Sequence, residues 1–362
     1  MKRITCFITA LSSGGAEHQI TMLSGYLAER GYLVSLVTFA DEDDHYVVDK
    51  RVERVTLNCD GKKWKKFWAI FRYFLTIKTD CVISFGAREN FLCLLPLLFR
   101  HNIKVLAGER CATYNKLDWY KRFNYRFLYG RANYIVPNSY TQKEDLSIRL
   151  PRYSGKIRVI TNFTDVTEYC ATPQPHNEPL RIGIFCRFAE QKNYRRFAYA
   201  VKLLKEQTNR LFEVHWFGNM HHGKDLIAQY VELNGLICKL HIEDCFFLHD
   251  HTRQVSVMLK GFDALCLPSL TEGFSNSISE YICCGRPVLA SDVADNKVMI
   301  KDGENGFLFN PESIESIANS FKRFFALSPE KLDEMGIKSR ELAESLFSKN
   351  RFVESYIKLV ES

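Results

Sequence analysis

The stretch of sequence that decides the fold runs from Cys266 to Asp292 and reads CLPSLTEGFSNSISEYICCGRPVLASD. The apolar run Ala264–Leu267 at its start predicts a buried strand, which a proline ends. After Ser275 the apolar residues recur at helical spacing until a glycine and a second proline stop the helix. Val288–Ala290 then predicts the next strand. This order of strand, loop, short helix and strand is typical of a doubly wound parallel sheet, in which ligands bind at the carboxyl ends of the strands.

Two acidic residues, Glu272 and Glu280, stand eight positions apart within this stretch. The predicted helix begins between Ser275 and Ser277, so its free backbone N–H groups and the positive end of its dipole favour phosphate oxygens. A carboxylate accepts hydrogen bonds from paired hydroxyls. Phosphates at the helix start and hydroxyl-bearing rings at the two acids therefore indicate a sugar nucleotide. The alternative is that Glu272 caps the helix and Glu280 is a solvated helix position.

The same stretch resembles the E-x7-E motif of the retaining glycosyltransferases of family 4, which have the two-domain GT-B fold. The resemblance lies in the sequence EGFSNSISE followed by GRPVLASD. It implies an α/β fold of two Rossmann-like, doubly wound domains that face a cleft. It also implies that Glu272 contacts the donor sugar hydroxyls in catalysis and that Glu280 holds the nucleotide ribose. The other donor-binding residues expected in this loop are Gly273, Phe274, Ser275 and Asn276.

A second strand-to-helix turn carries two cations. The apolar run Leu180–Phe185 predicts a strand, and Arg187 and Lys192 follow it five positions apart. Two cations at such a turn can neutralise a diphosphate as it leaves, although this spacing alone is a weak signal. The family has Gly-Arg, four residues and Lys here, and both cations bind the donor diphosphate, so the resemblance gives Arg187 and Lys192 catalytic roles. Cys186 replaces the glycine of that pattern, and Gly218 is a further expected donor-binding residue.

The first half of the chain offers a glycine turn at its start. Ile4–Ala10 predicts the first strand, and Gly14 and Gly15 follow it before a helical pattern. Two glycines at a strand-to-helix turn let the backbone approach a ligand closely, and the alternative is a tight connection without a ligand. The family carries a similar turn near the donor diphosphate and the acceptor, so the resemblance implies donor contacts for both glycines.

Two further loops of this half follow predicted strands, at residues 86–90 and 108–111, and both are expected to face the crevice. The family often has a histidine after the strand at 103–107, whereas this chain has Gly-Glu-Arg-Cys. A subgroup of bacterial polysaccharide and lipid-linked oligosaccharide transferases resembles this arrangement. The candidate cleft residues are Arg110, Glu109 and Asn162. The alternative for Arg110 is a structural ion pair with Glu109 or another acid.

Length and composition set broader limits. The 362 residues predict two domains. The 12 cysteines include no C-x-x-C pair and no spacing typical of metal ligands, which indicates a reducing cytoplasm. The N-terminus reads as a strand and not as a signal peptide, and the apolar run 91–99 is too short to span a bilayer. We expect no cofactor and no metal, because the GT-B family needs neither.

The positive charge is concentrated in the first half of the chain. Residues 1–170 hold 26 Lys and Arg against 17 Asp and Glu, whereas the net charge of the whole chain is +7. Basic residues alternate with aromatic ones at 62–74 and again at 119–129, where each segment predicts a helix. This combination suits an anionic membrane surface and predicts a peripheral protein at the inner face of the cytoplasmic membrane. The alternative is a soluble domain whose helices have an aromatic core face and a solvated basic face.

The predicted domains are residues 1–168 and 180–342, joined by a Pro-rich linker at 169–179. Residues 343–362 include an amphipathic helix, which the resemblance predicts to cross back to the first domain. The expected function is retaining transfer of a hexose or N-acetylhexosamine from a nucleotide sugar, UDP-linked by resemblance, to a glycan on a polyprenyl diphosphate in O-antigen or capsule synthesis. No nucleic-acid partner is expected. The alternatives are a GT-B nucleotide-sugar epimerase and a non-catalytic nucleotide-sugar-binding partner.

Overall fold

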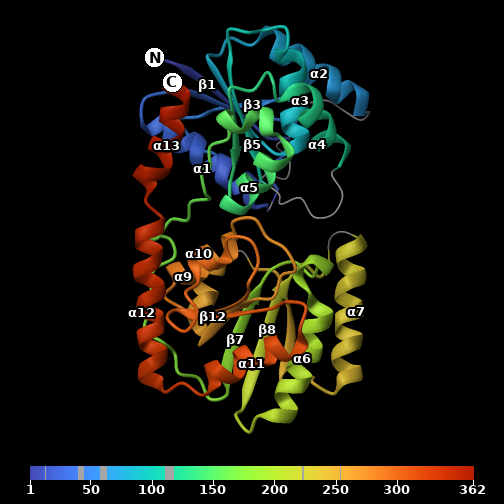
Figure 1. Ribbon diagram of the computed structural model, residues 1–362, viewed down its shortest axis with the longest axis vertical. Helices are drawn as coiled ribbons and strands as arrows, with labels where there is room; N and C mark the ends of the chain where they lie inside the picture. The colour runs from blue at the N-terminus through green and yellow to red at the C-terminus, as the bar shows by residue number, and fades with distance from the viewer. Residues whose placement is uncertain (13, 40–44, 58–62, 111–117, 222–223, 253) are drawn as a thin grey trace. The chain divides into compact units, whose positions relative to one another are not determined.

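The structure is a computed structural model that describes residues 1–12, 14–39, 45–57, 63–110, 118–221, 224–252 and 254–362. The chain forms two compact units (Figure 1). The first unit contains Met1–Phe163 and Lys349–Ser362, and the second contains Thr164–Ser348. Each unit is built on its own six-stranded sheet, and every strand pairing in both sheets is parallel.

The first unit has the strand order β3-β2-β1-β4-β5-β6. The order reverses between β1 and β4, which pair with Ile4 beside Cys81. The strands are β1 Arg3–Phe7, β2 Leu33–Thr38, β3 Glu53–Thr56, β4 Cys81–Phe85, β5 Lys104–Glu109 and β6 Tyr134–Pro137. The helices are α1 Gly15–Glu29, α2 Lys63–Thr76, α3 Ala87–Leu97, α4 Trp119–Phe123, α5 Tyr140–Arg149 and α13 Lys349–Glu361, with a π-helical turn at Asn124–Leu128 and a 3-10 turn at Pro151–Lys156.

Helices cover both faces of this first sheet. Figure 1 shows α1 and α13 on one side of it and α2, α3 and α4 on the other. Ile70 and Phe74 of α2 join the core formed by Val82 and Val105 of the strands. Because both faces are buried, the central strands read as continuous apolar runs, and all five residues of β4 are buried.

The second unit has the strand order β12-β11-β10-β7-β8-β9, which reverses between β10 and β7. The strands are β7 Leu180–Phe185, β8 Phe212–Gly218, β9 Phe246–Asp250, β10 Ala264–Leu267, β11 Val288–Ser291 and β12 Gly306–Phe309. The helices are α6 Tyr194–Gln207, α7 Lys224–Leu240, α8 Val255–Met258, α9 Asn276–Cys283, α10 Asn296–Met299, α11 Ile314–Phe325 and α12 Pro329–Leu346, with 3-10 turns at Glu190–Lys192 and Leu259–Gly261.

The core of the second unit lies between its sheet and the helices α6, α7 and α11. Trp216 of β8 is fully buried there beside Phe197 of α6. Helix α9 packs against β10, β11 and α12. The turn that the sequence placed at the centre of the fold is therefore the connection from β10 through α9 to β11, beside the reversal of the strand order.

The predicted helix at residues 119–129 was wrong as a single regular helix. The structure has the short helix α4 followed by the π-helical turn, in which the N–H of Tyr129 bonds the carbonyl of Asn124. Asn124 is buried, and its side-chain amide donates to the carbonyl of Ala87 at 2.7 Å. The widened turn accommodates this buried side chain, since such bulges occur where the regular hydrogen-bond ladder is interrupted.

The segment that the sequence marks as a linker is held on the second unit by two arginines. Arg286, which has no exposed surface, donates to the carbonyls of Thr172 (2.8 Å), Pro173 (3.2 Å) and Lys260 (2.7 Å). Arg340 donates to three more carbonyls, those of Val166, Tyr169 and Cys283. The boundary between the compact units accordingly falls between residues 163 and 164.

Candidate functional site

The predicted site residues of the second unit meet at the carboxyl ends of β7 and β10. Nζ of Lys192 lies 2.6 Å from Oε1 of Glu272, and each side chain is 12% exposed. Two neighbouring contacts join the same loops, because Gln191 donates to the carbonyl of Thr271 and accepts from the N–H of Leu270, each at 2.8 Å. Since β7 and β10 are neighbours in the sheet, the fold brings together an acid and a cation that are 80 positions apart in the chain.

The charges around this contact favour a bound anion. Burial by itself lowers the pKa of Lys192, but the charge of Glu272 and the hydrogen bond to it raise that pKa above its usual value. Lys192 therefore remains a cation at neutral pH. Arg187 is exposed beside it and has no hydrogen-bond or ion-pair partner within the part of the chain that the structure describes. One paired and one unpaired cation thus lie on the loop that follows β7.

Helix α9 begins at the same edge of the sheet. Ser275 caps it by accepting a hydrogen bond from the N–H of Ile278 at 3.4 Å. The hydroxyl of Ser277 donates to the carbonyl of Phe185 at 3.3 Å, which ties the first turn of the helix to the end of β7. The N–H groups of this turn therefore lie beside the loop that carries Arg187 and Lys192, in an arrangement that suits phosphate groups.

Glu280 lies one turn further along α9 in a partly buried position. Burial, and next the charge of Glu168, raise the pKa of Glu280 to about 8, although a hydrogen bond from Tyr169 acts in the opposite direction. Burial also raises the pKa of Glu168. Sequence reasoning missed Glu168, and the spacing holds no signal for it, because only the folding of residues 164–170 onto the second unit brings it near α9.

The remaining predicted donor-binding residues of the second unit differ in how accessible they are. Gly273 lies half-buried between Glu272 and Phe274, and Asn276 is the first residue of α9. Phe274 is 4% exposed and packs edge-on against Phe347, so its ring belongs to the core. Gly218 ends β8, where a Cβ atom would stand 2.9 Å from the carbonyl oxygen of Cys186, so close packing requires glycine there.

In the first unit, Gly14 and Gly15 lie at the start of α1 as predicted from the sequence. Gly14 is the N-cap residue, and a Cβ atom there would stand 2.2 Å from Oε2 of Glu17. The hydroxyl of Ser12 donates to the other oxygen of the same carboxylate at 3.0 Å. The glycine therefore makes room for an acidic side chain of the first helical turn.

The three candidate cleft residues do not form one cluster. Arg110 lies 3.5 Å above the ring of Phe85 and donates to Asn162 at 3.2 Å and to the hydroxyl of Tyr356 on α13. Glu109 is fully buried and accepts a hydrogen bond from Tyr129, and burial raises its pKa. The structure thus brings Arg110 to Asn162 and α13 and leaves Glu109 inside the core. Cys111, the last residue of the predicted loop, lies outside the described residues.

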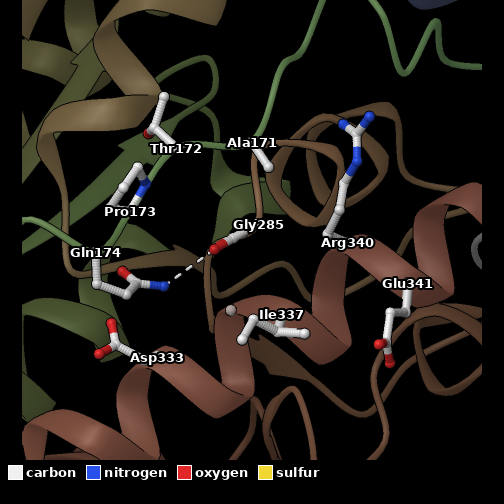
Figure 2. A pocket seen from close by; sticks show the side chains of 10 residues that line it. Ala171, Thr172, Pro173, Gln174, Gly285, Asp333, Ile337, Arg340 and Glu341 are labelled. Atoms are coloured by element: carbon white, nitrogen blue, oxygen red, sulfur yellow. Dashed lines mark hydrogen bonds between the residues drawn. The ribbon is translucent and has the colours of Figure 1, made fainter.

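A pocket of about 540 Å³ lies elsewhere on the second unit, between residues 171–174 and α12 (Figure 2). Gln174 donates to the carbonyl of Gly285 at 3.0 Å on one side of it. Ile337 and Arg340 line it from α12. None of the predicted donor-binding residues lines this pocket, so it is distinct from the edge of the sheet that carries Lys192 and Glu272.

Comparisons with known proteins cover nearly the whole chain. The family descriptions "Glycosyltransferase Family 4" and "Glycosyl transferases group 1" match residues 13–168 and 171–342. An uncharacterized glycosyltransferase of Haemophilus influenzae is 31% identical over 361 residues, which are 95% of this chain and 96% of that protein. The N-acetylgalactosamine-N,N'-diacetylbacillosaminyl-diphospho-undecaprenol 4-alpha-N-acetylgalactosaminyltransferase of Campylobacter jejuni is 22% identical, over 89% of this chain and 90% of its own.

The crystal structure of HepE from Anabaena in complex with UDP is similar to the chain, with a TM-score of 0.83, 16% identity and 100% coverage of both chains. Not every curated relative is matched along its whole length. In three of them, the aligned region covers only 26%, 50% and 26% of the relative.

Proposed function

This chain belongs to the glycosyltransferases of family 4, which have the GT-B fold, and from that premise we propose that it transfers a hexose or N-acetylhexosamine from a nucleotide sugar to a glycan acceptor with retention of configuration. The observation that carries the proposal is the contact between Lys192 and Glu272 at 2.6 Å, beside the open first turn of α9. This contact supports the proposal, because a cation that can bind a diphosphate and a carboxylate that can accept hydrogen bonds from sugar hydroxyls lie at one edge of one sheet.

The proposed chemistry follows from these charges. The bond between the anomeric carbon and the phosphate oxygen breaks, and the acceptor oxygen forms its bond on the same face of the sugar. The acceptor proton passes to the leaving phosphate, so no protein nucleophile takes part. Negative charge grows on the leaving diphosphate in the transition state, where Arg187, Lys192 and the N–H groups of α9 stabilise it. Glu272 orients the sugar ring through its hydroxyls, and Glu280 holds the ribose.

The names of similar proteins support the identity of the substrates. The printed name of the Campylobacter jejuni relative is that of an N-acetylgalactosaminyltransferase acting on a diphospho-undecaprenol-linked sugar, and HepE was solved with UDP. We propose the same classes of substrate for this chain, namely a UDP-linked donor and a polyprenyl-diphosphate-linked glycan acceptor. Because two cations and a helix N-terminus are available for the diphosphate, we also propose that the reaction needs no metal ion.

The test is a panel of nucleotide sugars incubated with the purified protein, with and without EDTA. Slow release of free nucleotide from one donor marks a transferase, and NMR of the transfer product then gives the anomeric configuration. A 2-epimer as the product would show an epimerase instead, and binding without turnover would show a non-catalytic partner. An inverted anomer would contradict retention, and loss of activity in EDTA would contradict metal independence.

Glu280→Gln is expected to raise the KM for the donor more than it lowers kcat, because a ribose contact is made equally in the ground and transition states. Steady-state kinetics with varied donor measures both constants, and Glu315→Gln, in the exposed first turn of α11, is the matched control. A collapse of kcat with an unchanged donor KM would place Glu280 at the reacting centre.

Glu280→Gln should also change how the stability of the protein depends on pH. Glu280 has a folded-state pKa of about 8 against its ordinary 4.5, so between these values the folded protein holds a proton that the unfolded chain has released. The stability of the unliganded protein should therefore fall as pH rises from 4.5 to 8. Urea unfolding at several pH values should show that Glu280→Gln removes this part of the slope.

We further propose that the first unit binds an anionic membrane surface. Trp64 and Trp68 of α2 are 59% and 58% exposed, beside the exposed Lys65. Trp119 of α4 is exposed as well, and α3 contacts both α2 and α4. The buried face of α2 belongs to the core, so the helix has both an aromatic core face and an exposed basic and aromatic face. Among the described residues, no helix is long and apolar enough to cross a bilayer.

Changing the four lysines 62, 63, 65 and 66 to glutamine is expected to abolish sedimentation with anionic vesicles at low salt. Each basic group contributes about 1 kcal/mol within a Debye length of the surface. Lys62 itself lies outside the described residues. The matched control removes the same charge from the second unit by changing four other lysines to glutamine, namely Lys239, Lys297, Lys301 and Lys331. Equal binding by both variants, or no binding by the wild type, would contradict the proposal.

A further inference from the structure

The first unit has its own reversal of strand order, between β1 and β4. The chain leaves β1 toward α1 and leaves β4 toward α3, and these helices lie on opposite sides of the sheet (Figure 1). The loops after the two strands therefore diverge at the carboxyl edge, which is where open α/β sheets bind their ligands. The sequence predicted a loop at 86–90 and assigned no residue in it, whereas the structure begins α3 at Ala87.

A carboxylate is fixed at this edge by both strands. Glu89, in the first turn of α3, is 8% exposed. Its Oε1 accepts a hydrogen bond from the hydroxyl of Thr9, just beyond β1, at 2.7 Å, and two from Nε and Nη2 of Arg88 at 3.3 Å. The Thr9 hydroxyl in turn accepts from Arg88. One oxygen of the carboxylate is thus fully engaged, and its position is set by two separate segments of the chain.

The other oxygen, Oε2, has no hydrogen-bond partner within the described part of the chain, although nine-tenths of the side chain is buried. It is not one of the polar atoms that the protein encloses completely, so it can be reached from outside. Within the described part of the chain, the hydrogen bonds to this carboxylate come from the side chains of Thr9 and Arg88. The backbone N–H of Gly86, the N-cap residue of α3, donates to the carbonyl of Gly108 instead.

The backbone conformation at Gly86 leaves room for this oxygen. Gly86 has a φ of 123°, a conformation that favours glycine, and a Cβ atom there would stand 2.4 Å from Oε2 of Glu89. A residue with a Cβ atom at position 86 would force the carboxylate to move. The same arrangement occurs after β1, where Glu17 stands over Gly14. Gly14-Gly-Ala-Glu17 and Gly86-Ala-Arg-Glu89 have the same spacing, so a repeated Gly-x-x-Glu is the sequence signal that marks both turns.

We propose that Glu89 is an acceptor-binding residue, whose Oε2 accepts hydrogen bonds from hydroxyl groups of the acceptor sugar. An ionised carboxylate only accepts hydrogen bonds, so it selects a ligand that donates them. A phosphate at this oxygen would be repelled by the carboxylate itself, and a cation would be repelled by Arg88. A neutral, hydroxylated ring is subject to neither repulsion. This inference rests on the proposed function, and it adds that the acceptor is recognised by its sugar and not only by its diphosphate.

The test compares Glu89→Gln with wild type in two reactions. The acceptors are hexoses and N-acetylhexosamines linked to farnesyl diphosphate, and the one that wild type uses best is chosen. The variant keeps the shape of the side chain but loses an acceptor atom, so the acceptor KM should rise about tenfold, the cost of one hydrogen bond to a charged group. Hydrolysis of the nucleotide sugar without acceptor, which does not involve this contact, should be unchanged. Glu315→Gln should match wild type in both reactions.

Deoxy versions of the acceptor show whether the contact is direct. Removing the hydroxyl that Glu89 binds should raise the acceptor KM of the wild type about tenfold. It should raise the acceptor KM of Glu89→Gln by little more, because the two changes remove the same interaction. Thr9→Val, which removes one of the hydrogen bonds to the engaged oxygen, should raise the acceptor KM by a smaller factor. Circular dichroism and urea unfolding confirm that each variant is folded.

The outcomes separate this inference from the function on which it rests. If wild type transfers sugar and Glu89→Gln keeps the wild-type acceptor KM, Glu89 does not bind the acceptor. If hydrolysis falls as much as transfer, Glu89 acts on the donor, and the inference is likewise overturned. If wild type neither hydrolyses any donor of the panel nor transfers its sugar, the proposed function is wrong, and this inference is wrong as well.

Discussion

Replacing Glu272 with alanine lowers turnover by an expected factor of 100 or more, which corresponds to about 2.7 kcal/mol of lost transition-state stabilisation. Glu272 is 12% exposed and holds Lys192 at 2.6 Å, so its loss removes the contact to the donor hydroxyls and also leaves a buried cation without its partner. The measurement is kcat for nucleotide release, with Glu304→Ala, an exposed loop residue of the same unit, as control. A folded Glu272→Ala protein that turns over at nearly the wild-type rate would rule out this site.

Lys192→Ala is expected to lower kcat by a similar factor, because it removes a cation that faces the growing charge of the diphosphate. The double variant should lose much less than the product of the two single losses, since each single change already disrupts the shared contact. Fully additive losses would show that the two residues act independently, and the 2.6 Å contact would then have no part in catalysis.

The second large effect concerns stability. Arg286→Ala is expected to lower the free energy of unfolding of the second unit by roughly 3 kcal/mol or more, because three carbonyl groups lose a charged donor whose own side chain is fully buried. Those carbonyls belong to Thr172, Pro173 and Lys260, which the arginine joins across the unit. Arg181→Met, whose side chain is 48% exposed and makes one ion pair with Glu213, should cost less than about 1 kcal/mol.

Tryptophan fluorescence makes this measurement specific to one unit. Of the 4 tryptophans, Trp216 alone lies in the second unit, fully buried in its core. In a background where the other three are phenylalanine, urea unfolding followed at Trp216 reports the second unit without interference from the first. An Arg286→Ala midpoint equal to that of the control would show that the linker segment contributes little to stability.

The strands that were predicted best are those buried on both faces. Leu180–Phe185 and Ala264–Leu267 were placed at the bounds that the structure gives, because such strands read as unbroken apolar runs. The π-helical turn after α4 depends on a buried asparagine and has no periodic signal.

The candidate site was predictable where one loop carries it. Glu272 and Glu280 share a single strand-to-helix turn, so the sequence placed them close together, and the surrounding residues with their resemblance to the E-x7-E motif predicted a common site. The pairing of Lys192 with Glu272 depends on which strands are neighbours, and spacing does not contain that information. Arg110 was expected in the cleft, whereas its partner Tyr356 lies 246 positions away on α13. Glu89 carries no family motif, and the Gly-x-x-Glu spacing that it shares with Glu17 became meaningful only with the geometry of Gly86 and Thr9.

The return of α13 to the first unit fixes an order of events during synthesis. Phe352, Val353 and Tyr356 of α13 are buried in the first unit, and Lys2 and Lys104 both donate to the carbonyl of Val360. The ribosome makes these residues only after the whole second unit, at roughly 5–20 residues per second. The first unit therefore leaves the exit tunnel first and is completed last. Until then the surface that α13 covers stays open, and a nascent chain stalled within the second unit is a ready substrate for chaperones and proteases.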